Sequence, residues 1–210
     1  MAILYHGECN EEMNHIEDKS IDCIFTDLPY AQLDGVKWDK MIDLEAMWVH
    51  FMRIKKNKTP IFFTCNTKFG VHLINSAPKK CPFRYEVVWK KSNPVGHLSC
   101  GWQPLRNHEL IYVFYENKPY YDLSSHMGKV VKENGNNRYG TCYSNKQGKI
   151  DKNVPVKKYD PPLPLSIIEI PTKRNGFHPT EKPVALMKYF FKYFTKEGDV
   201  VLDNCMGSGS

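Results

Sequence analysis

Short apolar runs alternate with longer amphipathic stretches along most of the chain. Consecutive apolar residues predict buried strands at residues 21–25, from Pro60, from Arg84, from His108 and at 200–202. Helical spacing of apolar positions predicts helices over residues 44–54, over 67–75 and after Thr180. The order strand, helix, strand, helix and then further strands is typical of an α/β fold with a mostly parallel sheet.

This pattern is interrupted between about residues 116 and 165. The segment is rich in Gly and Asn and has no sustained period, which predicts an exposed insertion with little regular structure. Between Lys118 and Asp160 the sequence contains nine Lys or Arg residues and only four acidic residues. Such a surplus suits the phosphate backbone of a nucleic acid, although a solvated basic loop without a partner would have the same composition.

The C-terminal part combines a helix with a glycine-rich turn. We expect Thr180 to be the helix N-cap. The predicted buried face of this helix consists of Val184, Met187, Phe191 and Phe194. The last apolar run leads into the pattern D-x-x-x-G-x-G, where glycines would let the backbone approach a ligand closely. Taken alone, this turn could hold a nucleotide or a sulfonium cofactor, or be purely structural.

The first predicted strand ends in Asp27-Leu28-Pro29-Tyr30. Because α/β folds bind ligands at strand ends, this tetrapeptide would present a carboxylate, a peptide carbonyl and an aromatic ring to a ligand. Two acceptors and a flat ring suit a base that carries an NH₂ group. The alternative is an ordinary turn that ends a strand.

Several protein classes are not favoured by the sequence. No apolar run is long enough to span a bilayer, and the N-terminus does not resemble a signal peptide. The seven cysteines are scattered and form no C-x-x-C pair, so we expect free thiols, no metal site and a reducing, cytoplasmic location. Trp89 and Trp102 are expected to anchor the core or a loop, with stacking on a base as the alternative.

Three features follow one another in chain order: the motif D-L-P-Y, the basic middle segment, and the C-terminal stretch from H-P-T-E-K-P to D-N-C-M-G-S-G. In these features the sequence resembles the β-type, circularly permuted family of amino DNA methyltransferases. These enzymes methylate adenine N6 or cytosine N4. The resemblance implies a Rossmann-like, S-adenosylmethionine-dependent methyltransferase sheet that acts on double-stranded DNA in a bacterial or phage-type host. It further implies that residues 1–117 are the catalytic half, 118–165 a target-recognition insertion and 166–210 the cofactor-binding part.

The resemblance also assigns roles to residues. In the catalytic group of Asp27, Leu28, Pro29 and Tyr30, the carboxylate and the Leu28 carbonyl would accept the amino hydrogens of a flipped base while Tyr30 stacks on it. Cofactor binding is assigned to Glu8, His178, Thr180, Lys182, Pro183, Asp203, Met206, Gly207 and Gly209. The basic insertion adds the DNA-binding candidates Arg138, Lys146, Lys149 and Lys152.

Two questions stay open at this point. The family normally continues beyond the glycine turn, so we expect a truncated chain, with a homodimer or a second chain as a means of completing it. A non-catalytic DNA-binding remnant or subunit is therefore the alternative function. Asp27 favours adenine N6, with cytosine N4 as the alternative target. A nucleotide-dependent oxidoreductase is disfavoured. Its glycine fingerprint should open a strand-helix-strand unit, and the sequence has no residues after the glycines that could form one.

Overall fold

The computed structural model describes residues 2–30, 35, 39–127, 159–172, 181–207 and 209. The chain divides into a larger unit, Met1–Tyr121 with Leu165–Ser210, and a smaller unit, Asp122–Pro164. The roles expected for the three segments of the chain stay predictions. All the elements discussed below, except one short 3₁₀ turn, belong to the larger unit.

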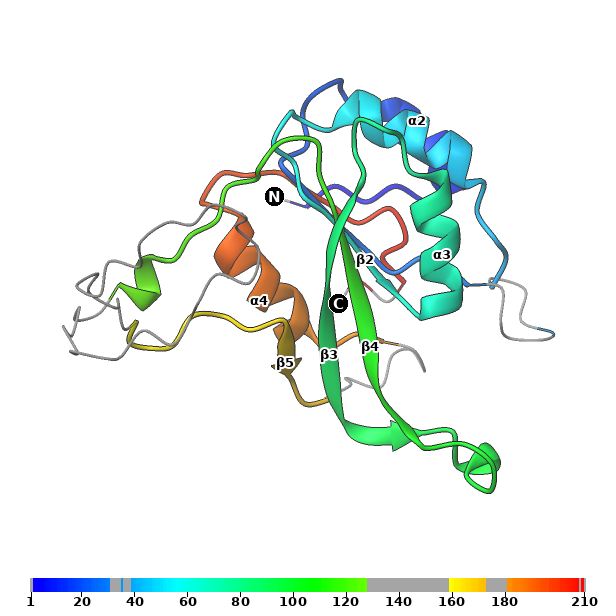
Figure 1. The fold of residues 1–210 in the computed structure, drawn as a ribbon. Coiled ribbons are helices and arrows are strands. Elements are labelled where there is room, and N and C mark those ends of the chain that lie inside the picture. The colour runs from blue at the N-terminus through cyan, green and yellow to red at the C-terminus, as the bar shows by residue number, and fades with distance from the viewer. Residues whose placement is uncertain are drawn as a thin grey trace, which may run out of the picture. The chain divides into compact units, whose positions relative to one another are not determined.

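A six-stranded sheet forms the centre of the larger unit, with strand order β5-β3-β4-β2-β1-β6 (Figure 1). The strands are β1 (Cys23–Thr26), β2 (Ile61–Cys65), β3 (Phe83–Val95), β4 (Arg106–Phe114), β5 (Ile167–Glu169) and β6 (Val201–Leu202). β1 is parallel to β2 and β6, and β3 is parallel to β5, whereas β4 is antiparallel to both of its neighbours. The predicted α/β fold with a mostly parallel sheet is confirmed, and β4 is reversed because it forms a hairpin with β3.

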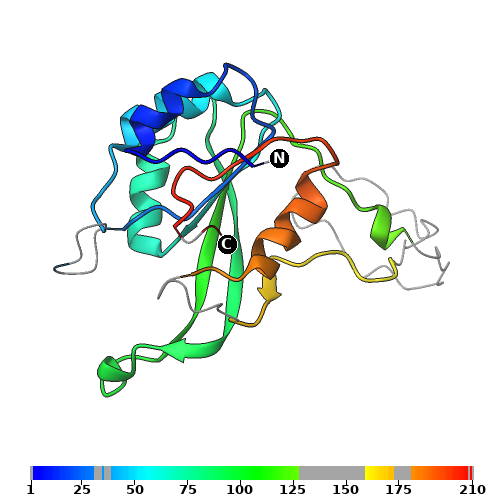
Figure 2. The same cartoon turned by 180° about the vertical axis from the view of Figure 1, so that it is seen from behind.

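Helices cover both faces of this sheet. The α-helices are α1 (Cys9–Glu12), α2 (Leu44–Ile54), α3 (Thr67–Ser76) and α4 (Val184–Phe194), and the 3₁₀ turns are η1 (Met13–His15), η2 (His97–Ser99) and η3 (Ser124–His126). Side chains cap the two central helices at their N-termini: Asp43 accepts from the Ala46 amide, and Asn66 accepts from the Phe69 amide. Helices α2 and α3 lie over one face and α4 over the other (Figures 1 and 2).

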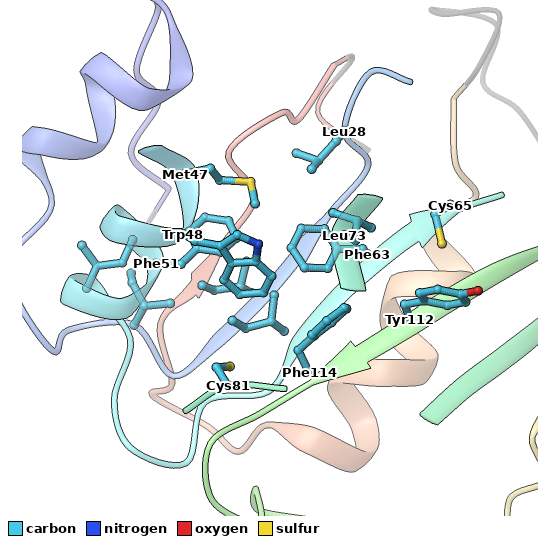
Figure 3. Close-up of a cluster of buried hydrophobic side chains, with 14 of the residues drawn as sticks. Leu28, Met47, Trp48, Phe51, Phe63, Cys65, Leu73, Cys81, Tyr112 and Phe114 are labelled. Atoms are coloured by element: carbon cyan, nitrogen blue, oxygen red, sulfur yellow. The ribbon is translucent and has the colours of Figure 1, made fainter. Parts of the chain in front are cut away.

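β2 divides its side chains between two cores. Ile61, Phe63 and Cys65 point into the cluster under α2 and α3, whereas Phe62 points into the cluster under α4. This alternation follows from the two-residue period of a strand. Every side chain of β2 is buried, because both faces are covered. Figure 3 shows the first cluster, in which Trp48 packs near Phe63.

Helix α4 corrects two expectations. It begins at Val184 with Pro183 in the N-cap position and no side-chain cap, so Thr180 is not its N-cap. Its buried face consists of Leu186, Phe190, Tyr193 and Phe194, of which only Phe194 was predicted. The prediction failed because nearly every position of this helix is apolar, so that two different stripes satisfy the 3.6-residue period.

The β3–β4 hairpin extends well beyond the rest of the sheet and ends in η2 (Figures 1 and 2). Trp89, near its base, is buried and donates from its indole nitrogen to the Ile170 carbonyl at 2.9 Å, as expected for a core anchor. Trp102, at its tip, is 78% exposed, so the expectation that it anchors a loop was wrong.

The described part of the chain contains no helix long and apolar enough to cross a bilayer. Its six cysteines are free thiols, as predicted, and Cys142 lies outside the described residues.

Candidate active site

Four segments that are distant in the sequence meet at one edge of the sheet. β1, β2 and β6 are parallel, so the residues that follow them leave the sheet at the same carboxyl edge. β4 runs in the opposite direction, so its beginning reaches this edge too: Leu110 pairs with Cys65 at the end of β2. Ligands of α/β folds bind at such an edge.

Asp27 follows directly after β1 and is held by three polar groups. Its Oδ1 atom lies 2.9 Å from the Tyr30 hydroxyl and accepts a hydrogen bond from the Thr64 hydroxyl. Its Oδ2 atom accepts from the Lys182 ammonium. Because each carboxylate oxygen has two acceptor positions, Oδ2 retains one that no described residue occupies. The carboxylate is therefore fixed in orientation and able to accept one more donor.

Tyr30 is tied into the same group. Its hydroxyl lies 2.8 Å from the Thr64 carbonyl oxygen, in addition to Asp27. Its ring packs against Phe69 with the centroids 5.0 Å apart and the planes tilted by 35°. Burial, followed by the Asp27 charge, raises the Tyr30 pKa well above its usual value, so the phenol is a neutral donor. The structure gives Tyr30 a role in holding Asp27, and stacking on a base stays a prediction.

Leu28 and Pro29 complete the predicted tetrapeptide. Leu28 as a whole residue is only 2% exposed, and its side chain belongs to the core beneath α2, as Figure 3 shows. The role expected for its backbone carbonyl stays a prediction. Pro29, partly buried, keeps the chain extended after the strand.

Lys182 connects Asp27 to a second acidic residue that the sequence did not indicate. Its Nζ atom lies 3.8 Å from Oε2 of Glu109 on β4, and Oε1 of Glu109 accepts from Lys91 on β3. The four groups form a row of alternating charges, Asp27, Lys182, Glu109 and Lys91. The buried Pro183 follows Lys182 and starts α4, which fixes the lysine at this point.

The segment after β6 brings Asp203 and Asn204 to the same edge. Asn204 Oδ1 accepts from the Thr26 hydroxyl at 2.8 Å, which ties this segment to the end of β1. Asp203 as a whole is an exposed residue, and its Oδ1 atom accepts from the Cys205 amide at 2.9 Å. Loss of solvent, with a smaller contribution from the Asp27 charge, raises the Asp203 pKa to about 6. Two carboxylates thus lie near each other.

The glycine turn leaves free space around its backbone. Gly207 has φ +57° and Gly209 has φ +75°, a region that side chains with a Cβ rarely adopt. Among the described residues, a Cβ at Gly207 would meet no atom within 4 Å, and one at Gly209 would meet only Met206 Cε at 3.8 Å. Met206 is 41% exposed. The turn is therefore open to a ligand.

Glu8 lies beside this turn but has a local partner. It is the N-cap of α1 and accepts from the amides of Asn10 and Glu11. The neighbouring Cys9 thiol donates to the Glu8 carboxylate at 3.5 Å, and it lies close enough to Cys205 and Asn204 for both to lower its pKa, which places α1 near the glycine turn. Glu8 is thus near the expected cofactor site, with its carboxylate engaged in capping.

The remaining predicted site residues lie outside the described part of the chain: His178, Thr180, Arg138, Lys146, Lys149 and Lys152. Among the residues that the structure describes, no cluster of His, Cys, Asp or Glu side chains could hold a metal ion.

Comparison with known proteins agrees with this site. The model of the DNA methylase family of N6- and N4-methyltransferases matches residues 21–210. The type II methyltransferase M2.MboI of Moraxella bovis is 26% identical over 99% of this chain and 76% of its own length. The DNA adenine methyltransferase YhdJ of Escherichia coli is 25% identical, over 98% and 71%.

A solved structure shows the same fold. The crystal structure of the M1.HpyAVI–SAM complex superposes with a TM-score of 0.59 at 16% identity, over 98% of this chain and 82% of that one. Because the family model covers both the Asp27 segment and the glycine turn, which converge at one sheet edge, the chain belongs to the DNA methylase family of amino-group methyltransferases.

Proposed function

We propose that this protein transfers a methyl group from S-adenosylmethionine to the exocyclic amine of a base in double-stranded DNA, with adenine N6 as the target. The observation that carries the proposal is the Asp27 carboxylate. Tyr30, Thr64 and Lys182 orient it at the ligand-binding edge of the sheet, and Oδ2 retains one acceptor position. An amino hydrogen of a base fits this position.

The residues after β6 fit the cofactor. The glycine turn has open space where side chains would otherwise stand. The buried side-chain nitrogen of Asn204, Nδ2, has no acceptor among the described residues except the Cys9 sulfur, which is a weak one. It could therefore donate to a ligand. Asp203 directly precedes Asn204 and the glycine turn in the chain. Its carboxylate offers an acceptor for a cationic ligand group. When bound, S-adenosylmethionine supplies a methyl group activated by its sulfonium.

The mechanism needs a flipped base, because a stacked amine cannot reach a pocket at a sheet edge. An adenine amine is a poor nucleophile, since its lone pair is delocalised into the ring. A hydrogen bond from this amine to Asp27, with a second to the Leu28 carbonyl, favours a more tetrahedral nitrogen whose lone pair points at the methyl carbon. As the N–C bond forms, the S–C bond would break with its electron pair returning to sulfur, and the positively charged nitrogen would then lose one proton to water.

Lys182 and Glu109 act on the position of Asp27. Lys182 binds one carboxylate oxygen, and Glu109, 3.8 Å from Lys182, holds the ammonium from the other side. Lys182 was expected to bind the cofactor, but its described contacts support a role in positioning Asp27.

Adenine is favoured by the aspartate that begins the tetrapeptide and by the similarity to YhdJ, which is named as an adenine enzyme. The test is incubation of duplex DNA with labelled S-adenosylmethionine, digestion to nucleosides and chromatography. Label in N6-methyladenine is the expected result. Label in N4-methylcytosine would show the alternative target, and DNA binding without any transfer would show a non-catalytic DNA-binding protein.

We assign phosphate contacts to Arg138, Lys146, Lys149 and Lys152, because they lie in the segment with the largest basic surplus. Double-stranded DNA is therefore the proposed partner. The proposed location is the cytoplasm, where such DNA and the cofactor are both available.

The raised pKa of Asp203 predicts a pH-dependent affinity for S-adenosylmethionine. The ionised carboxylate attracts the cofactor's ammonium group, and protonation removes this attraction. The Asp203 pKa in the free protein is about 6. The affinity for S-adenosylmethionine should therefore reach its highest value above about pH 7 and fall towards pH 5, at most about tenfold per pH unit. Calorimetric titrations between pH 5 and 8 measure this. Asp203→Asn should bind weakly with little pH dependence, and an unchanged profile in this variant would contradict the assignment.

A further inference from the structure

The tip of the β3–β4 hairpin carries two large apolar side chains that no described residue covers. Leu98 is 95% exposed and Trp102 78%, the two highest values among the large hydrophobic side chains of the described chain. Leu98 lies within η2 and Trp102 follows three residues after it, at the far end of the hairpin in Figures 1 and 2. Exposed apolar side chains grouped at one tip are typical of a contact surface.

The tip is a preformed turn. The Ser99 amide donates to the Gly96 carbonyl at 2.9 Å, and the Trp102 amide donates to the Ser99 carbonyl at 3.2 Å. Gly96, with φ +94°, allows the strand to bend into η2. Since hydrogen bonds already fix the backbone, little further ordering is needed when a partner binds.

The charge of the hairpin indicates the partner. Between Lys90 and His108 there is no acidic residue, whereas Lys90, Lys91 and Arg106 are basic. Glu169 and Glu109 pair with the two lysines, but Arg106 is exposed at the start of β4. A partner that offers both negative charge and flat apolar surfaces fits this tip. Duplex DNA provides both, as phosphates and as stacked bases.

The tip is also connected to the active site. Glu109 lies three residues from Arg106 along β4, which is about 10 Å at the rise of a strand. The same hairpin thus carries part of the charge row beside Asp27 and, further out, Leu98 and Trp102.

We infer that Leu98 and Trp102 form a wedge that enters the base stack of the DNA and keeps it open while the target base occupies the site at Asp27. This inference rests on the proposed function, because flipping a base requires the stack to be opened. Apolar side chains that insert between base pairs lower the cost of this opening.

The experiment compares Trp102→Ala and Leu98→Ala with the unaltered protein. Val49→Ala is the matched control, because Val49 is 69% exposed on α2, away from the hairpin. The probes are a duplex that the unaltered protein binds and the same duplex with an abasic residue opposite the adenine proposed as the target, in which the pair is already broken. The dissociation constant of each protein is measured with both duplexes. In a second measurement, the fluorescence of 2-aminopurine at the target position reports whether the base is unstacked.

On the intact duplex, we expect Trp102→Ala to weaken binding about ten- to a hundredfold and to lose the aminopurine signal. Leu98→Ala should have a smaller effect in the same direction. On the abasic duplex, Trp102→Ala should weaken binding only about threefold or less, since no base pair has to be opened. Val49→Ala should match the unaltered protein on both.

Unchanged binding in the Trp102 and Leu98 variants, or an equal loss on both duplexes, would overturn the wedge. Altered self-association with unchanged DNA affinity would also overturn it and would make the tip a contact between copies of the chain. Methyl transfer by the unaltered protein is read separately, so its absence would count against the proposed function.

Discussion

Replacing Asp27 by alanine is expected to reduce methyl transfer roughly a hundred- to a thousandfold. The variant loses the acceptor for the base amine and the group that aligns it with the methyl donor, and a single preorganised polar group contributes about 10² to 10³ in rate. DNA affinity should remain within about threefold, because Asp27 acts on the flipped base and does not contact phosphates. Single-turnover transfer and DNA binding, measured on the same preparation, test both expectations.

Asp22→Ala is the control for this variant. Asp22 precedes β1 at the opposite end from Asp27 and accepts from Lys56 at 2.7 Å. Both changes remove a paired carboxylate next to the same strand, but only one removes it from the ligand-binding edge. Nearly full transfer by Asp22→Ala with none by Asp27→Ala supports the assignment. Full activity of Asp27→Ala would refute it.

Replacing Lys182 by methionine is expected to lower the turnover number about a hundredfold while changing the KM for S-adenosylmethionine little. Its ammonium binds Asp27 Oδ2 and lies 3.8 Å from Glu109, so its loss frees the carboxylate to rotate. It also leaves Glu109 without a counter-charge on that side. A misplaced catalytic group lowers turnover more than it weakens cofactor binding.

Lys192→Met is the matched control, since Lys192 is exposed on α4 and contacts only the Tyr193 ring among the described residues. It should retain full turnover. A raised KM with an unchanged turnover number in Lys182→Met would show instead that Lys182 is a cofactor ligand, which was the expectation from the sequence.

The fold could be predicted largely because its signals are local. The end of β1 is determined by Pro29, and α2 and α3 by apolar spacing with Asp43 and Asn66 as caps. The buried face of α4 was predicted wrongly, because an almost wholly apolar helix does not indicate which stripe faces the sheet. That choice depends on packing against Phe25 and Phe62, which lie more than a hundred residues away.

The site could be predicted only where a motif marks it. Asp27, Asp203 and Gly207 were assigned from motifs, but Thr64 and Glu109 were missed. Thr64 reaches Asp27 because β2 is parallel to β1, and Glu109 reaches Lys182 because β4 is reversed. Both contacts follow from long-range strand pairing. One local signal was available: Glu109 is the acidic residue that directly precedes the apolar run 110–114 of β4.

In the proposed reaction, the methyl donor and the target base meet beside Asp27, between Lys182 and the glycine turn. A crystal structure with S-adenosylhomocysteine tests this arrangement most directly. We expect this ligand to lie along Asp203 to Gly209, with its sulfur within roughly 8 Å of the Asp27 carboxylate. That span allows about 3 Å for the hydrogen bond and about 3 to 3.5 Å between the reacting atoms, beyond the S–C bond. A ligand bound elsewhere, or with its sulfur turned away from Asp27, would contradict the account.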